Sequence, residues 1–324
     1  MPARPQLPPP DVVAGQPLGI FLDLPLLTGA EQPHVGYVAA AQTPSPGAVA
    51  FHRSPENAGF MLRALATTAA TTGITLDALP AGPEGRIDFA SRVRVRLDRG
   101  ELASVTRAAL LSGANAAAVQ NANGDWEVLQ IETAVLVAPA TYELSTLLRA
   151  QAGTDGAMLP SLAAGARFVL LDRALTPVDM APADIGLTFN WRFGPAARDI
   201  GHASYASATH TFSGVGLRPF SPVHVRGARD GSGDLVISWI RRTRINGDAW
   251  TAGEVPLAEG SERYEIDILD GSTIVRTLAA TSPSVIYTAA DQTTDFGTPQ
   301  SACTIRVHQL AAGYGRGTPR DAVV

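Results

Sequence analysis

Two prolines flank an aromatic residue in Arg218-Pro-Phe-Ser-Pro-Val223, and this short stretch constrains the fold strongly. Each proline fixes its own φ angle and biases the preceding residue towards extended geometry, so the stretch predicts a stiff joint. A long, turn-rich segment precedes the joint, and a compact series of strand-like stretches follows it. We therefore expect two domains, which is also what 324 residues suggest at roughly 100–200 residues per domain.

The segment 218–324 predicts an immunoglobulin-like β-sandwich. Apolar and polar residues alternate from Leu235 to Ile240, with Trp239 on the apolar face. Strands are predicted at 222–229, 234–243, 263–270, 273–279, 284–289, 301–310 and 318–324. Seven short strands separated by turns are typical of such a sandwich, and a single cysteine, Cys303, favours the fibronectin type III variety. Cys303 occupies the place of the usual tyrosine of strand F, so a tyrosine corner is not expected.

The segment 18–217 is predicted to be β-rich as well, with a possible subdomain break near 138–160. Alternating residues predict strands at 18–24, 35–41, 48–54, 60–79, 89–97, 126–137, 165–172, 185–194 and 203–213. The stretch 142–149 has apolar residues at i, i+2, i+5 and i+6, and Thr141 could cap it, so we predict a short helix there. The proline-rich residues 1–17 are interpreted as an extended lead-in, a linker to something upstream.

Charge and composition argue against two classes of protein. The formal net charge of −5 disfavours a nucleic-acid binder, which needs a basic face. Arg92, Arg94 and Arg96 share one face of a predicted strand, but neighbouring acidic residues cancel most of their charge. No run of about 18 apolar residues and no signal peptide is present, so we expect no membrane span and synthesis in the cytoplasm.

No motif of catalysis or cofactor binding stands out. The six histidines do not fall at metal-ligand spacing, and nucleophile-elbow, dinucleotide and P-loop patterns are missing. Asp291, Asp295 and Glu259 lie in predicted loops, and a glycosidase would need two such carboxylates across a cleft. We expect no catalytic residue, no metal and no cofactor, and we expect Cys303 to be a buried thiol.

Five residues form a candidate contact surface. Trp250 lies in a predicted loop and is the tryptophan best placed to contact a ligand such as a glycan. Near it in the sequence are three arginines, Arg241, Arg242 and Arg244, and Tyr314 lies in the glycine-rich turn 313–317. The alternative for the arginines is the solvated end of a strand.

Several stretches together resemble one family. They are Leu22-Asp-Leu-Pro-Leu-Leu27, residues 142–154, residues 165–171, the joint 218–223 and Trp239-Ile-Arg-Arg-Thr-Arg-Ile245. They look like the C-terminal part of the large tail hub proteins of gene transfer agents and related siphophages. The family patterns read Leu-Ser-x-Leu-Leu-Arg-Gly-x-x-Gly-Thr, Arg-Pro-Tyr-Ser-Pro-Val and Trp-x-Arg-Arg. Here Ala150 replaces a glycine and Phe220 replaces the tyrosine.

The resemblance implies a structural part of a phage-like tail tip or baseplate. Hub-like β-domains would form a trimeric ring, and the fibronectin-like module would face outward towards fibre and other baseplate proteins. The location implied is the tail of a virion or phage-like particle. The cell-wall-degrading region of longer family members lies upstream of the matching part, so the resemblance implies no enzyme activity, and the chain would be a truncated or separately encoded C-terminal piece. The alternatives are a receptor- or glycan-binding adhesin that uses the sandwich, and a hydrolase built from loop carboxylates.

Overall fold

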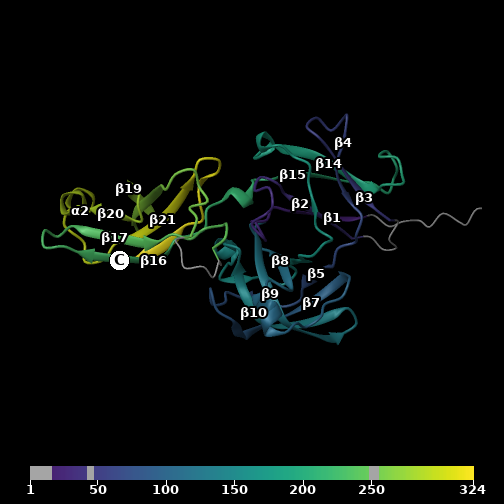
Figure 1. Ribbon diagram of the computed structural model, residues 1–324, viewed down its shortest axis with the longest axis horizontal. Coiled ribbons are helices and arrows are strands. Elements are labelled where there is room, and N and C mark those ends of the chain that lie inside the picture. Colours follow the sequence, from purple (N-terminus) through teal and green to yellow (C-terminus); the bar gives the residue numbers. More distant parts are fainter. Residues whose placement is uncertain (1–16, 42–46, 248–254) are drawn as a thin grey trace, which may run out of the picture.

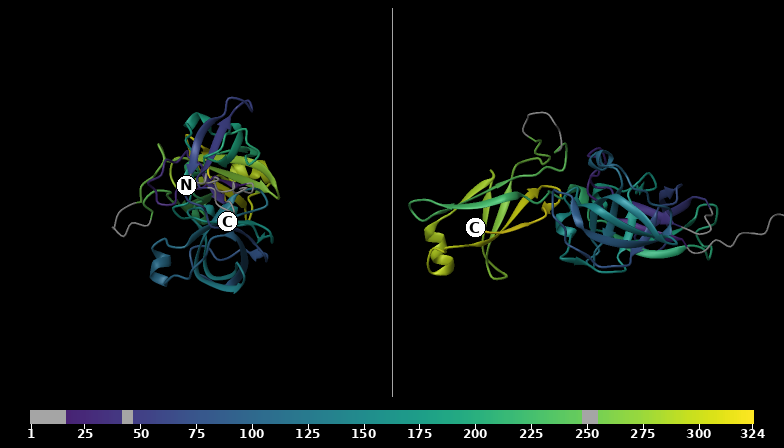
Figure 2. Two further views of the ribbon diagram at one scale, coloured as in Figure 1. Left: turned by 90° about the vertical axis from the view of Figure 1, so that its right-hand side faces the viewer. Right: turned by 90° about the horizontal axis from the view of Figure 1, so that it is seen from below.

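The protein is mainly β, as predicted, and its strands form three bodies (Figure 1). The computed structural model describes residues 17–41, 47–247 and 255–324. An N-terminal domain of two sheets and a closed barrel lie side by side, and a sandwich extends from them along the long axis (Figure 2). In the described ranges, no helix is long and apolar enough to cross a membrane.

The N-terminal domain packs a three-stranded sheet against a four-stranded one. The first contains β1 (Leu18–Leu22), β2 (Tyr37–Ala41) and β13 (Thr176–Pro177); the second has the order β15-β14-β3-β4 and contains β3 (Val49–Ser54), β4 (Met61–Ala66), β14 (Thr188–Pro195) and β15 (Ala206–Thr211). Aromatic side chains fill the space between them, among them Phe51, Trp191, Phe193 and Phe212. Two 3-10 turns, η2 (Pro182–Asp184) and η3 (Val215–Leu217), follow β13 and β15 in the chain.

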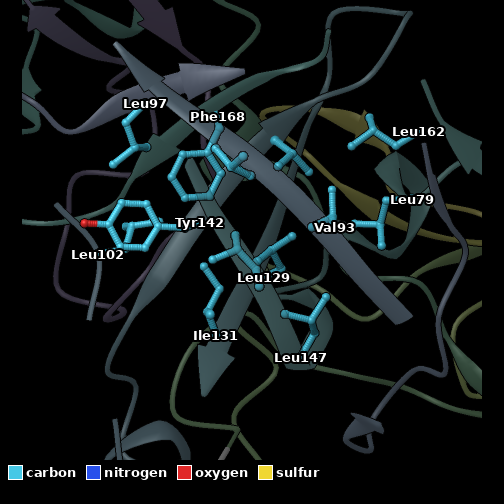
Figure 3. Packing of buried hydrophobic residues seen from close by; sticks show 14 residues of the cluster. Leu79, Val93, Leu97, Leu102, Leu129, Ile131, Tyr142, Leu147, Leu162 and Phe168 are labelled. Atoms are coloured by element: carbon cyan, nitrogen blue, oxygen red, sulfur yellow. The ribbon is translucent and has the colours of Figure 1, made fainter. Parts of the chain in front are cut away.

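The barrel closes in the order β10-β7-β5-β12-β8-β9. Its strands are β5 (Thr72–Thr75), β7 (Asp88–Arg99), β8 (Ala116–Gln120), β9 (Trp126–Ala138), β10 (Thr141–Gln151) and β12 (Arg167–Leu170). The predicted alternation of β7 places Val93, Val95 and Leu97 in the interior (Figure 3). The barrel segment also holds a short pair, β6 (Leu79–Pro80) with β11 (Ser161–Leu162), and two short helices, α1 (Arg107–Leu111) and η1 (Thr154–Ala157).

The barrel is an insertion in the N-terminal domain. The chain leaves that domain after β4 and returns to it at β13. The faces of β1 tie the two bodies together, because Ile20 and Leu22 pack against barrel residues such as Trp126, while Phe21 packs against the four-stranded sheet. The predicted break near 138–160 is therefore wrong: β9 and β10 pair with each other through the first half of that range.

The predicted helix at 142–149 is also wrong, because these residues form β10. Tyr142 and Leu144 point into the barrel in strand alternation. The pairing with β7 is then irregular between Ser145 and Leu147, where Thr146 has φ of 57°, and Leu147 points inward as well. This irregularity turns an alternating pattern into one that resembles helical spacing.

The C-terminal body is a sandwich of a three-stranded sheet facing a five-stranded one, an immunoglobulin-like arrangement of the fibronectin type III kind. One sheet has the order β16 (Val223–Arg229), β17 (Leu235–Ile240), β20 (Ser284–Tyr287). The other sheet begins with the order β19 (Thr273–Ala280), β18 (Tyr264–Asp270), β21 (Thr304–Ala311). Two further strands of this sheet, β22 (Gly315–Arg316) and β23 (Arg320–Val323), both pair with β21. Trp239 and Cys303 are buried in its core, as predicted. Helix α2 (Ala289–Phe296) joins the two sheets where the sequence predicts a loop.

Candidate functional site at the joint between barrel and sandwich

Residues 218–223 form the predicted extended joint, and its aromatic ring is anchored on the barrel side. The ring of Phe220 lies against Gly153, just before η1; a Cβ atom on this glycine would lie 2.2 Å from Phe220 Cδ1. Gly153 has φ of 73°, a left-handed conformation that glycine adopts without strain. Only a glycine therefore fits here without displacing the joint.

Arg242, which follows β17 of the sandwich, binds both the proline-containing joint and the barrel segment. Its Nε donates to the backbone oxygen of Ser221 at 2.6 Å, and its Nη2 donates to Oδ1 of Asp155 in η1 at 2.7 Å. The guanidinium also lies 5.6 Å from the centroid of the Phe220 ring. The Asp155 side chain is 6% exposed and the Arg242 side chain 30%, so the ion pair is partly shielded from solvent, and its hydrogen bond is charge-assisted.

The last strands of the sandwich close the joint from the other side. The backbone N–H of Thr318 donates to the oxygen of Pro219 at 3.0 Å, and the Ser221 hydroxyl donates to the oxygen of Pro319 at 2.9 Å. A more exposed ion pair, Arg320 with Glu84 at 3.0 Å, links β23 directly to the barrel segment. The sandwich is thus attached to the barrel at several points.

A buried ion pair lies in the barrel just before Gly153. Arg149 on β10 makes two hydrogen bonds, of 2.6 and 2.8 Å, to the carboxylate of Glu127 on β9, and a third of 2.8 Å to the oxygen of Pro80. The two side chains are 1% and 2% exposed. The pair fixes the end of β10 from which the chain enters η1.

Three of the stretches that carry the sequence resemblance meet at this joint. The stretch 142–154 supplies Arg149 and Gly153, the stretch 218–223 supplies Phe220, and the stretch 239–245 supplies Arg242. They are far apart in the chain, so the sequence alone gives no sign of their contact.

The arginines of the predicted contact surface bind within the chain. Arg244 pairs with Glu259 at 2.9 Å and donates to the oxygen of Gly216, and both partners of the ion pair are buried. Arg241 donates to the oxygens of Val255 and Pro256. Both therefore fasten the segment that follows β17.

The other two described residues of the predicted contact surface have different surroundings. Arg242 belongs to the joint described above. Tyr314 lies half-buried in the turn between β21 and β22, and Trp250 lies outside the described residues. The sequence signal for the joint was present in the two prolines and in Trp-x-Arg-Arg, but it did not reveal that Arg242 reaches η1.

The carboxylates considered for a hydrolase have other partners. Asp295 lies on α2, where it pairs with Arg276 at 2.6 Å and accepts a hydrogen bond from Tyr287 at 2.7 Å. Asp291 accepts from Thr288 at the start of the same helix, and Glu259 pairs with Arg244 as described above. Within the described ranges, no group of three or more His, Cys, Asp or Glu side chains could hold a metal ion.

Two of the three arginines on the outer face of β7 are paired. Arg94 binds both oxygens of Asp77, and its guanidinium lowers the pKa of that carboxyl to about 2. Arg92 pairs with Glu143 at 3.1 Å. These two arginines therefore form surface ion pairs, and neighbouring carboxylates offset their charge as the sequence suggests.

The outer face of the five-stranded sandwich sheet holds a charged network that the sequence did not reveal. Asp267 is completely buried and accepts two hydrogen bonds from Arg316 and one from Thr277. Burial alone would raise its pKa, but these donors outweigh burial and the pKa of Asp267 lies below its ordinary value. Arg316 also pairs with Glu265, so the network stiffens this face.

Two solved structures are weakly similar to this chain. Rat CD45 extracellular region, domains d3–d4, is similar at 11% identity with a TM-score of 0.24, over 42% of this chain and 62% of that one. Chicken CNTN1 FN1–FN3 domains are similar at 14% identity with a TM-score of 0.24, over 75% and 65%. The chain thus spans less than two thirds of either structure.

Residues 70–169 match the family model described as Rcc01698-like, C-terminal. This range contains every strand of the closed barrel except the last residue of β12. No curated protein matches the chain.

Proposed function

We propose that the protein is a structural connector of a phage-like tail tip or baseplate, which acts as a homotrimer and links the hub to fibre or host-contact proteins. The observation that carries this proposal is the joint: three motif stretches of the tail-hub resemblance converge on it. The match of residues 70–169 to the Rcc01698-like, C-terminal family supports it on the barrel.

A fixed joint suits a connector. Domains linked by a small polar interface usually move relative to each other. Here the packing of Phe220 on Gly153, the Arg242–Asp155 pair and the bond from Thr318 to Pro219 oppose such motion. In this function the surfaces of the β-sheets bind neighbouring proteins and the joint holds the domains in place, and no residue performs chemistry.

Mass spectrometry of purified tail-like particles from the source cells tests the proposal. We expect the protein to be present at a small multiple of three copies per particle. Light scattering of the isolated protein should give three times the monomer mass of 33.8 kDa. A strictly monomeric protein that is absent from the particles would overturn the proposal.

The alternative of a glycan-binding adhesin has less support, because the three arginines of its contact surface bind within the chain. A glycan array with the full chain separates the two functions. Specific binding that is lost in a Trp250→Ala variant would favour the adhesin, and a blank array would favour the connector.

A further inference from the structure

His308 is a buried histidine on the outer face of the five-stranded sandwich sheet. It lies on β21, where Ile305 and Val307 point into the core, so strand alternation places His308 on the opposite face. The residue is nevertheless only 7% exposed. Its Nδ1 lies 3.0 Å from the oxygen of Gly317. A carbonyl oxygen can only accept, so Nδ1 carries the proton of the neutral ring and Nε2 carries none.

Gly317 begins the segment that closes the proline-containing joint from the sandwich side. We call this segment, Gly317-Thr318-Pro319, the clasp. The N–H of Thr318 donates to the oxygen of Pro219 at 3.0 Å, and a Cβ atom on Gly317 would lie 2.6 Å from the same oxygen. The N–H of Gly317 also donates to the oxygen of Gln309 on β21 at 2.8 Å. The ring of His308 therefore binds the residue of the clasp that packs directly on the joint.

Charged groups surround the ring of His308. They are Glu265 and Asp267 on β18, Arg306 on β21 itself, Arg316 on β22 and Asp321 on β23. Nε2 lies 3.9 Å from Oδ2 of Asp267, but Arg316 already donates two hydrogen bonds to that carboxylate.

The surroundings favour the neutral ring while the clasp is closed. Burial and the guanidiniums of Arg316 and Arg306 lower the pKa of His308. The oxygen of Gly317 and the carboxylate of Asp267 act in the opposite direction, but they offset this effect only in part. A second proton on the ring is therefore taken up at a cost to the closed clasp.

We propose that His308 is a pH switch of the joint, in which uptake of a second proton by its ring releases the clasp from Pro219. The new Nε2–H needs an acceptor, and the carboxylate beside it, that of Asp267, is occupied by Arg316. Arg316 directly precedes the clasp in the chain, so displacement of its side chain moves Gly317. The inference goes beyond the proposed function, because it concerns a joint within one chain and needs no assembly of copies.

The direction of the switch follows from linkage. When the clasp is open, the ring of His308 is exposed to water and regains its ordinary pKa of about 6.5. The open state then binds the proton more readily than the closed state. The clasp is thus closed at neutral pH, and its opening equilibrium rises by up to about tenfold for each pH unit below that value. In acid the sandwich keeps its barrel-side contacts, those of Phe220 and Arg242, but loses the clasp.

Hydrogen exchange of the Thr318 amide in the full chain tests the proposal, because this N–H is bonded to Pro219 only in the closed clasp. The exchange rate is measured at pH 7.5 and pH 5.0 and divided by the intrinsic rate at each pH. We expect the protection of Thr318 to fall by about tenfold in acid, while the amides of β10 in the barrel keep theirs. Unchanged protection of Thr318 would overturn the proposal. An equal loss in β10 would overturn it too, because the whole chain would then be unfolding.

Two variants separate His308 from other groups that titrate. His308→Asn keeps an N–H that can donate to Gly317 but cannot take up a proton, so its Thr318 protection should change by less than about twofold between the two pH values. The control is His210→Phe, which removes a histidine from the N-terminal domain and should keep the full loss. A wild-type loss in His308→Asn, or no loss in His210→Phe, would overturn the switch.

Arg316→Gln tests the same step without a change to the ring, and it decides the question if His308→Asn does not fold. The substitution frees Asp267 to accept from Nε2 of the charged ring. The acid-induced loss of Thr318 protection should then be several times smaller than in the wild type. An undiminished loss would show that competition for Asp267 does not open the clasp, and the proposal would fail.

Discussion

At the scale of single residues, the ion pair of Arg149 and Glu127 is the feature whose loss should cost most. Both charges are buried, and each is held by the other. Replacement of one partner leaves the other charge without compensation in the barrel. We expect Arg149→Met to lower the free energy of unfolding by about 3–5 kcal/mol, measured by urea denaturation. The double variant Arg149→Met/Glu127→Leu should lose less than Arg149→Met alone; an equal or larger loss would contradict this explanation.

His210 should make the N-terminal domain sensitive to acid. Its ring stacks on Phe21 at 4.7 Å and meets Phe212 edge-on at 4.4 Å. Burial lowers the pKa of His210, and the nearby carboxylate of Asp23 offsets this only in part. The unfolded chain therefore binds the proton more readily, so stability should be full above about pH 6.5 and fall as the pH drops below that value.

The measurement is the melting temperature of wild type and His210→Phe between pH 8 and pH 5. The variant keeps an aromatic ring in the cluster but cannot take up a proton. We expect the wild type to lose more of its melting temperature than the variant as the pH falls, because all other groups titrate alike in both. Parallel curves across the whole range would show that His210 does not contribute.

At the scale of elements, what the sequence predicts depends on how regular the element is. The seven sandwich strands follow plain alternation and are confirmed within a few residues. β10 was missed because the irregularity at Thr146 interrupts its alternation. Helix α2 was missed although residues typical of helix ends flank it. Thr288 is its N-cap, and the Thr288 hydroxyl accepts a hydrogen bond from the N–H of Asp291. Gly297, with φ of 82°, ends the helix.

The turn into η1 offers a matched test of the joint. Gly153 and Gly165 both have positive φ, but only Gly153 is in contact with Phe220, while a Cβ on Gly165 would meet no atom within 4 Å. Both alanine substitutions therefore carry a similar backbone cost of about 1 kcal/mol, and Gly153→Ala must also displace the ring. We expect Gly153→Ala to destabilise the protein by about 1–2 kcal/mol more than Gly165→Ala in urea denaturation. Equal costs would mean that the ring contact is dispensable.

At the scale of the whole molecule, the sequence predicts the bodies better than their connections. The joint at 218–223 is local, so two prolines suffice to indicate it. The insertion of the barrel depends on β2 and β13, which are about 135 residues apart in the chain yet pair with each other. Local alternation of apolar and polar residues cannot predict a contact between segments so far apart in the chain. The contact of Arg242 with Asp155, which brings the resembling stretches together, could not be predicted for the same reason.

The relative position of sandwich and barrel should depend on Arg242. Its side chain joins Asp155 on the barrel side to Ser221 in the joint, so Arg242→Ala removes the bridge but leaves both cores intact. We expect small-angle X-ray scattering to show a larger radius of gyration and a broader distance distribution for Arg242→Ala than for wild type, with a melting temperature only slightly lowered. The control is Arg94→Ala, which removes an arginine with two bonds to Asp77 within the barrel and should leave the scattering curve unchanged. If the Arg242→Ala curve also superimposed on that of the wild type, the packing of Phe220 and the bonds of Pro219 and Pro319 would be sufficient to hold the sandwich in place, and the bridge would not set the position of the sandwich.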